Sequence, residues 1–164
     1  MNILLKNLVD SCVGSLVFYA VGFGIAYGDD PTSKTRNVFV GNSGFLMQDY
    51  DNWAFFIFQA SFAATASTIV SGAVAERCHF HAYLIFSMIC VGWTYPCVVH
   101  WMWSAQGFLC PFNTEMKRIG KNGAFDFAGD AAVHLVGGVS ALVAAIILGP
   151  RHGRYDPSRA DEFK

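Results

Sequence analysis

Charged side chains are scarce in this sequence. Asp, Glu, Lys and Arg make up 14% of its 164 residues, whereas a soluble domain carries about a quarter. Hydrophobic residues reach 54%, and the mean hydropathy is +0.37. The shortage of charge predicts a membrane protein. The net charge of −1 argues against nucleic acid as a partner, because nucleic-acid-binding surfaces carry an excess of Lys and Arg.

Several kinds of chemical site are also missing. There is no Gly-rich phosphate loop, no paired-cysteine zinc spacing and no nucleophile elbow, so we expect no enzyme, no cofactor and no metal centre. His79 and His81 form an isolated H-x-H, which is more typical of solvated loop histidines than of a metal site.

The cysteines lack C-x-x-C pairing, and we expect buried thiols rather than a disulfide scaffold. They are Cys12, Cys78, Cys90, Cys97 and Cys110. Nothing at the N-terminus resembles a cleavable signal peptide.

Long apolar runs dominate what is present. A helix needs about 20 apolar residues to cross the bilayer core, and four segments meet this requirement. We predict an all-α, multi-pass membrane protein with spans at about residues 8–27, 53–75, 80–103 and 127–148, and a charged cytoplasmic tail or loop at 149–164. The second span is rich in small residues, which allow close helix packing, so we expect it to lie centrally. Pro96 predicts a kink in the third span.

Ionisable residues gather in and before the fourth predicted span. Such residues are costly in hydrocarbon and usually mark a substrate or proton pathway. His134 lies eight residues past Asp126, about 12 Å at 1.5 Å per residue, which predicts either a pore-lining histidine or a neutral core histidine. Asp126 is placed to cap the helix or to favour a cation at a pore mouth. Gly137 and Gly138 allow a neighbouring helix to approach, and Asp130 needs a partner or a wet cavity.

Aromatic residues form a second candidate group. Phe58 and Phe62 are four positions apart in the second span and therefore share one helix face. With Trp103, at the end of the third span, they either pack together or form an aromatic site for a small cation. Both interpretations stay open on spacing alone.

Five blocks of the sequence, in order, are similar to the ammonium transporter (Amt/Mep) family. They are FQASFA at 58–63, IVSGAVAER at 69–77, VVHWMW at 98–103, DFAG at 126–129 and VHLVGG at 133–138. The resemblance runs from about residue 6 to residue 151. The related Rhesus proteins share the aspartate and the histidine but generally lack the tryptophan, so Trp103 favours the Amt/Mep branch.

The resemblance implies a fold and a function. Members have eleven membrane helices in an inverted-repeat arrangement, and they form homotrimers with one pore per subunit. This chain would correspond to about helices two to five of a multi-pass protein of the plasma membrane, embedded in lipid, that transports ammonium or ammonia, with methylammonium as an analogue. The first helix and the helices that carry the second pore histidine and the second gate phenylalanine would lie outside this sequence.

The resemblance also implies roles for single residues. Trp103 and Phe62 would hold ammonium through cation–π contacts, and Phe62 would be one of two phenylalanines that gate the pore, with Phe58 beside it in the vestibule. Asp126 would support this site without touching the ion, and His134 would be the first of two pore histidines. The family usually has a small residue where Asp130 stands, which would alter conduction or proton coupling.

Three other functions compete with transport. The first is a non-transporting ammonium sensor, or a truncated subunit that assembles with longer ones. The second is a Rhesus-type ammonia or CO2 channel. The third is an intramembrane enzyme with a metal held by Asp126, His100 and His134, which the spacing disfavours because these residues lie on two helices without a ligand pair at i, i+3 or i+4.

Overall fold

The computed structural model describes residues 3–28, 37–113 and 122–159. Within these ranges the protein is helical and contains no strand. The elements are α1 (Ile3–Val17), η1 (Phe18–Gly22), α2 (Phe23–Tyr27), η2 (Phe45–Met47), α3 (Trp53–Ala73), α4 (Phe80–Ile89), η3 (Cys90–Thr94), α5 (Tyr95–Trp103), η4 (Asp130–Leu135) and α6 (Val136–Leu148). η1, η3 and η4 are π-helical turns and η2 is a 3-10 turn.

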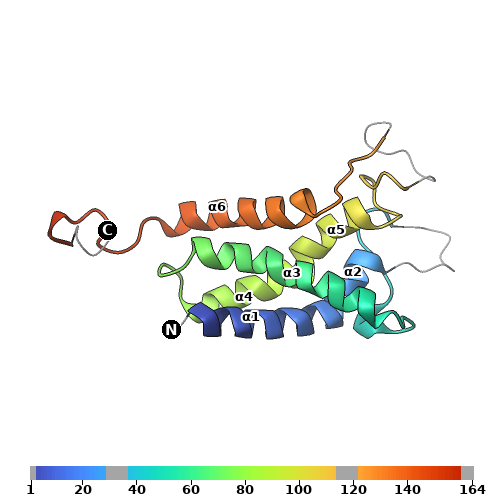
Figure 1. The fold of residues 1–164 in the computed structure, drawn as a ribbon, viewed down its shortest axis with the longest axis horizontal. Helices are drawn as coiled ribbons and strands as arrows, with labels where there is room; N and C mark the ends of the chain where they lie inside the picture. Colours follow the sequence, from blue (N-terminus) through green and yellow to red (C-terminus); the bar gives the residue numbers. More distant parts are fainter. Residues whose placement is uncertain (1–2, 29–36, 114–121, 160–164) are drawn as a thin grey trace.

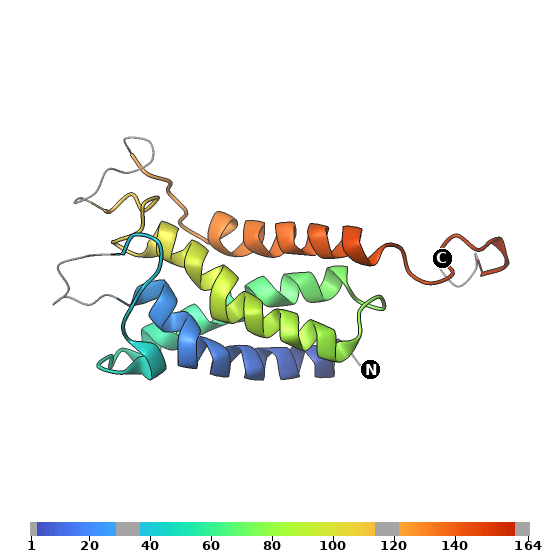
Figure 2. The same cartoon turned by 180° about the vertical axis from the view of Figure 1, so that it is seen from behind.

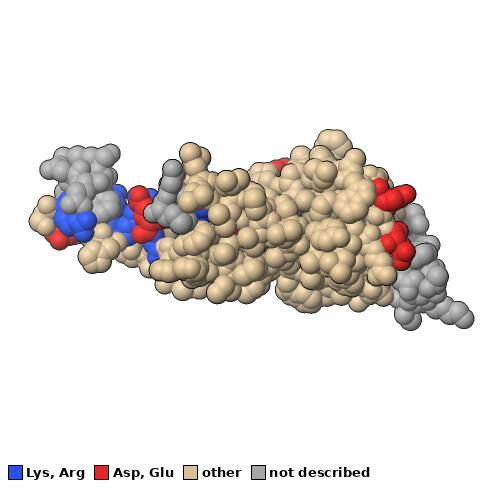
Figure 3. Space-filling view, turned by 90° about the horizontal axis from the view of Figure 1, so that it is seen from below, with Lys and Arg blue, Asp and Glu red and all other residues tan. Residues whose placement is uncertain are grey.

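These elements join into four long helices that lie side by side (Figure 1). By length and composition four helices could cross a membrane: Leu4–Tyr27, Trp53–Ala73, Phe80–Trp103 and Asp130–Leu148. On the face shown in Figure 3, charged side chains gather at the two ends of the molecule, and a long belt without them lies between. The predicted all-α fold with four membrane-spanning helices is therefore confirmed.

The fourth span begins later than predicted. It starts at Asp130 rather than Phe127, because Gly129 has a φ of +88°, a left-handed conformation that the helix cannot include. Phe127 precedes this break and is 88% exposed. His134 is four positions after the helix start at Asp130. It therefore lies about 6 Å along the helix, rather than the 12 Å predicted from Asp126.

The first span begins earlier than predicted, at Leu4, because its polar residues have partners inside the bundle. Asp10 is fully buried. Its carboxylate accepts hydrogen bonds from the hydroxyls of Tyr83 at 2.7 Å, of Ser67 at 2.9 Å, and of Ser87. The Lys6 ammonium group lies 3.9 Å from the centre of the Tyr83 ring. One acid thus joins α1 to both α3 and α4.

The third span contains a π-helical turn where a kink was predicted. The backbone N–H of Tyr95 donates to the carbonyl of Cys90, five residues earlier, and Pro96 follows directly in the first turn of α5. The wider turn places the proline at a helix start, where its missing N–H costs little. In Figure 2, which shows the molecule from behind, α4 and α5 follow one another across the bundle in front of α3.

His100 on α5 stabilises the end of the bundle at which α5 finishes. The ring is fully buried, with Nδ1 3.0 Å from the carbonyl oxygen of Ala26 and Nε2 2.9 Å from that of Asn37. The neighbouring Trp101 donates from Nε1 to the carbonyl of Phe39 at 2.8 Å. The segment after residue 36 is therefore held against α5, close to Trp103. His100 thus has a structural position, away from Asp126 and His134.

The opposite end of the bundle is tied together by two arginines. Arg77 donates from Nη1 to the carbonyl of Gly149 at 2.9 Å. Nε of Arg151 lies 3.0 Å from the Glu76 carboxylate, and both side chains are about half exposed. The link between α3 and α4 therefore contacts the beginning of the segment that follows α6.

α3 is the central helix, as its small residues predicted, and it contacts α1, α5 and α6. The backbones of α3 and α6 approach each other closely at Gly137 on α6. A Cβ atom at Gly137 would lie 2.9 Å from both the Ala66 carbonyl oxygen and Ile69 Cβ, whereas one at Gly138 would meet nothing within 4 Å. The predicted close approach thus occurs at Gly137 and not, within the described residues, at Gly138.

We expect Asp10→Ala to destabilise the full-length protein strongly. The substitution removes the acceptor that three buried hydroxyls share. Ser67 and Tyr83 still have a backbone carbonyl within reach, whereas an unsatisfied Ser87 hydroxyl costs about 1–3 kcal/mol. Thermal unfolding of the purified protein in detergent, compared with Asp10→Asn, measures this. Asp156→Ala, at an exposed acid, is the control. Equal melting temperatures for Asp10→Ala and the control would contradict the proposed importance of the cluster.

The paired glycines give a matched test of the α3–α6 contact. Gly137→Ala should lower the melting temperature and the amount of assembled protein, because the added methyl group meets the backbone of α3. Gly138→Ala should leave both unchanged or raise them slightly, since alanine favours a helix by about 1 kcal/mol over glycine. If the two variants behave alike, the contact between α3 and α6 is not as described.

Candidate functional site

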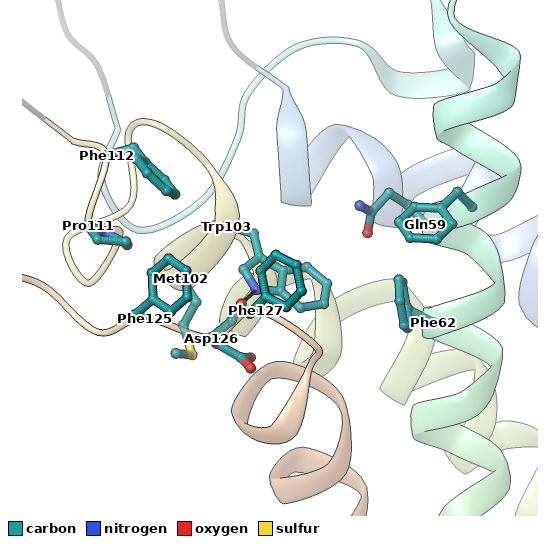
Figure 4. A pocket seen from close by; sticks show the side chains of 10 residues that line it. Gln59, Phe62, Met102, Trp103, Pro111, Phe112, Phe125, Asp126 and Phe127 are labelled. Atoms are coloured by element: carbon teal, nitrogen blue, oxygen red, sulfur yellow. Dashed lines mark hydrogen bonds between the residues drawn. The ribbon is translucent and has the colours of Figure 1, made fainter.

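Aromatic side chains enclose a cavity of about 350 Å³ at the end of the bundle where α5 finishes. Its walls come from α3, from the end of α5, and from the segments before and after residues 114–121 (Figure 4). The lining residues are Phe58, Gln59, Phe62, Met102, Trp103, Pro111, Phe112, Phe125, Asp126 and Phe127. The cavity therefore joins residues from three separate parts of the sequence.

Three rings form a continuous aromatic wall. The ring centres of Phe58 and Phe62 are 4.9 Å apart, and those of Phe62 and Trp103 are 5.6 Å apart, both in edge-to-face arrangements. Phe58 is 56% exposed, while Phe62 and Trp103 are partly buried. The structure thus brings the predicted aromatic residues together. Ring faces carry partial negative charge, so such a wall attracts a small cation.

Trp103 is held in place by the main chain of Asp126. Its indole Nε1 donates to the Asp126 carbonyl oxygen at 2.8 Å. With its N–H engaged, the indole has only its ring surface to offer a ligand. The orientation of the ring thus depends on where the chain runs just before the fourth span.

The carboxylate of Asp126 is occupied by backbone amides. Oδ1 accepts from the N–H of Gly129 at 3.0 Å and Oδ2 from the N–H of Ala132 at 2.9 Å. These donors belong to the start of the fourth span, so Asp126 caps the helix from four residues ahead of it. Both carboxylate oxygens are thus engaged with backbone amides.

His134 points out of the four-helix bundle. Its ring is exposed, and Nδ1 lies 3.2 Å from the carbonyl oxygen of Gly129. A carbonyl only accepts hydrogen bonds, so this contact places the proton of a neutral ring on Nδ1. Nε2 then carries a lone pair that can accept a hydrogen bond or a proton.

Asp130 stands at the helix start rather than one turn inside the membrane. It is the first residue of η4 and is exposed. An acid in the first turn interacts favourably with the helix dipole, so it needs no partner in the bundle.

His79 and His81 are exposed at the other end of the molecule, with their Nδ1 atoms 3.4 Å apart. The described residues contain no group of three or more His, Cys, Asp or Glu that could hold a metal.

Reasoning from the sequence missed six of the ten lining residues, and Gln59 is the one among them with a polar side chain. It is 6% exposed, and Oε1 has no hydrogen-bond partner among the described residues. A signal was present in the sequence, because this amide stands between the two phenylalanines Phe58 and Phe62.

Comparisons with known proteins agree on one family. The family model described as the Ammonium Transporter Family matches residues 1–164. Ammonium transporter 1 member 3 of Solanum lycopersicum is 45% identical over 161 residues, which cover 95% of this chain and 33% of the relative. Putative ammonium transporter 1 of Caenorhabditis elegans is 42% identical over 161 residues, covering 98% and 29%. The chain thus spans about a third of the length of these relatives.

Two solved structures share the fold. The chain matches a structure titled Sensor Amt Protein with a TM-score of 0.73 and 35% identity, over 94% of this chain and 37% of the other. It matches Saccharomyces cerevisiae Mep2 with a TM-score of 0.74 and 24% identity, over 92% and 32%, a likeness of fold alone. With four helices able to cross a membrane, this is a multi-pass membrane protein. The family match over the whole chain shows that it belongs to the Ammonium Transporter Family.

Proposed function

We propose that this chain forms the recruitment site and the beginning of the conduction path of an ammonium transporter. The observation that carries the proposal is the aromatic cavity, in which Phe62 and Trp103 stand 5.6 Å apart beside the segment that Asp126 holds. Membership of the Ammonium Transporter Family supports ammonium as the ion for which this site is built.

The cavity suits the capture of a small hydrated cation. Its volume of about 350 Å³ is more than ten times the roughly 30 Å³ that a water molecule occupies in the liquid. An ion can therefore enter with part of its hydration shell. Each aromatic contact contributes about 0.5–2 kcal/mol as the ion loses water. Phe62, which contacts both Phe58 and Trp103, is placed to close the way out of the cavity and is our candidate gate.

His134 is our candidate for the first pore residue. Potassium cannot lose a proton, whereas ammonium can, and the lone pair on His134 Nε2 provides an acceptor for an N–H group or a proton. The histidine lies on the helix whose start is fixed by Asp126. The segment whose main chain holds Trp103 thus leads directly into the helix that carries His134.

The assembled protein would follow the plan of the family. We propose a homotrimer in the plasma membrane, with the charged segment 149–164 on the cytoplasmic side. The plan of the family carries this orientation, because six of the eleven Lys and Arg residues lie outside the described ranges and charge alone does not set it.

A second candidate function is sensing of ammonium without transport. The observation that favours it is the 35% identity to a structure titled Sensor Amt Protein. The aromatic cavity would then bind the cation, and the contact between residues 76–77 and 149–151 would relay its presence.

Uptake of labelled methylammonium distinguishes the two functions. The full-length protein is produced in cells that lack their own ammonium transport, beside a His134→Ala variant. We expect saturable uptake that ammonium inhibits and potassium does not, and we expect the variant to differ from the wild type. A well-expressed protein that binds ammonium but takes up nothing would favour the sensor.

Trp103→Leu should raise the KM for methylammonium about tenfold while leaving the amount of protein in the membrane unchanged. The substitution removes one aromatic face, worth about 1–2 kcal/mol for a desolvated ion. Trp101→Leu, two positions away and outside the cavity lining, is the matched control. Unchanged uptake kinetics for Trp103→Leu would argue against an aromatic cation site.

Asp126→Ala should abolish uptake, and Asp126→Asn should retain part of it. Alanine leaves two amide N–H groups uncapped, a loss of about 0.5–2 kcal/mol for a helix cap, and releases the segment that holds Trp103. Asparagine keeps one acceptor oxygen but removes the charge. Uptake and membrane abundance are measured together. Full uptake by Asp126→Asn would show that the charge contributes nothing.

A further inference from the structure

Gln59 differs from every other polar side chain of the cavity. Both oxygens of Asp126 accept backbone hydrogen bonds, and the indole N–H of Trp103 is engaged as well. Gln59 Oε1, in contrast, is buried and has no partner among the described residues. A buried oxygen left in this state costs free energy, so it needs an explanation in this structure.

The side chain extends into the site. Gln59 lies one helix turn before Phe62, on the same face of α3, and both line the cavity. In Figure 4 its amide extends from α3 toward the side on which Trp103 and Phe127 lie. The amide therefore stands at the edge of the aromatic wall, in surroundings that are otherwise apolar.

From this we infer that Gln59 is a specificity-determining residue of the cavity, whose Oε1 accepts a hydrogen bond from a cation that carries N–H groups. The inference rests on the proposed function and names a further residue of the same site. Its ligands are ammonium and small primary alkylammonium ions.

The chemistry of the two kinds of contact explains why both are needed. Aromatic rings attract any cation of suitable size and give it no directional hydrogen bond. An amide oxygen is a directional acceptor that replaces one water molecule of an ammonium ion. The amide NH₂ group at the same place would repel the ion, so the carbonyl end is the one that fits. Gln59 thereby adds recognition of N–H groups to the attraction provided by the rings.

Gln59→Leu in the full-length protein is the first test. We expect the KM for labelled methylammonium and the inhibition constant of ammonium to rise about tenfold, the loss expected for one hydrogen bond to a charged group. The maximal rate per molecule should stay unchanged, because a contact made equally throughout the step affects KM alone. The amount of folded protein should stay equal or rise, since an unsatisfied buried oxygen is removed.

Gln106→Leu is the matched control. Gln106 is also 6% exposed and has a buried amide atom, Nε2, without a partner among the described residues, but it does not line the cavity. We expect its KM to equal that of the wild type. Equal KM values for wild type and Gln59→Leu would overturn the inference, and the partner of Oε1 would then be a group of the protein itself.

A second variant and a binding measurement complete the test of Gln59. If Gln59→Leu does not accumulate in the membrane, Gln59→Asn is measured in its place. Asparagine keeps the amide but draws it back toward α3. A raised KM for Gln59→Asn supports the inference, and an unchanged KM overturns it. Should the wild type and Gln106→Leu both lack saturable uptake, the proposed function fails. Equilibrium binding of labelled methylammonium to the purified proteins then tests Gln59 alone, with about tenfold weaker binding expected for Gln59→Leu and equal binding contradicting the inference.

Discussion

The carboxylate of Asp126 fixes the geometry on which the candidate site depends. A helix that starts near a membrane surface has backbone N–H groups without partners, and in hydrocarbon such groups must be satisfied by the protein. Asp126 supplies two acceptors for them. Because the main-chain carbonyl of the same residue accepts from Trp103, the start of the fourth span and the orientation of the indole are set together. The aromatic wall therefore depends on a helix cap.

Asp10, which is buried, and Asp126, which is partly buried, meet the same constraint with different results. Asp10 is surrounded by hydroxyl donors from α3 and α4, and a fully satisfied cluster of this kind makes the packing of three helices specific. Asp126 is satisfied by backbone, so its own side chain joins no second helix. Its position at the edge of a cavity leaves aromatic surface, rather than polar groups, for a ligand to contact. The first arrangement suits a fixed scaffold and the second suits an ion that must also leave.

The sequence predicted the parts of this protein that depend on length and local spacing. Four apolar runs predicted four spans, and the spacing of Phe58 and Phe62 predicted a shared face that the structure contains. The start of the fourth span could not be read in the same way, because Phe127 is as apolar as the helix that follows, and only the left-handed Gly129 ends the loop. The hydrogen bond from the Trp103 indole to Asp126 could not be predicted from the sequence either, because its acceptor is a backbone carbonyl and every residue has one.

The position of His134 shows that one face of the fourth span is not covered by the described helices. The fourth span is the least buried of the four, with 17% of its apolar window covered, and His134 and Leu135 both face outward from it. A histidine exposed at that level would meet lipid if nothing covered it, which is unfavourable for an ionisable group. The described helices therefore hold the elements of the proposed cation site, while we expect enclosure of the path beyond Phe62 to come from helices packed on this face. Recognition and enclosure are in this way separate properties of the fold, since the cavity forms from α3, α5 and two connecting segments without the covering helices.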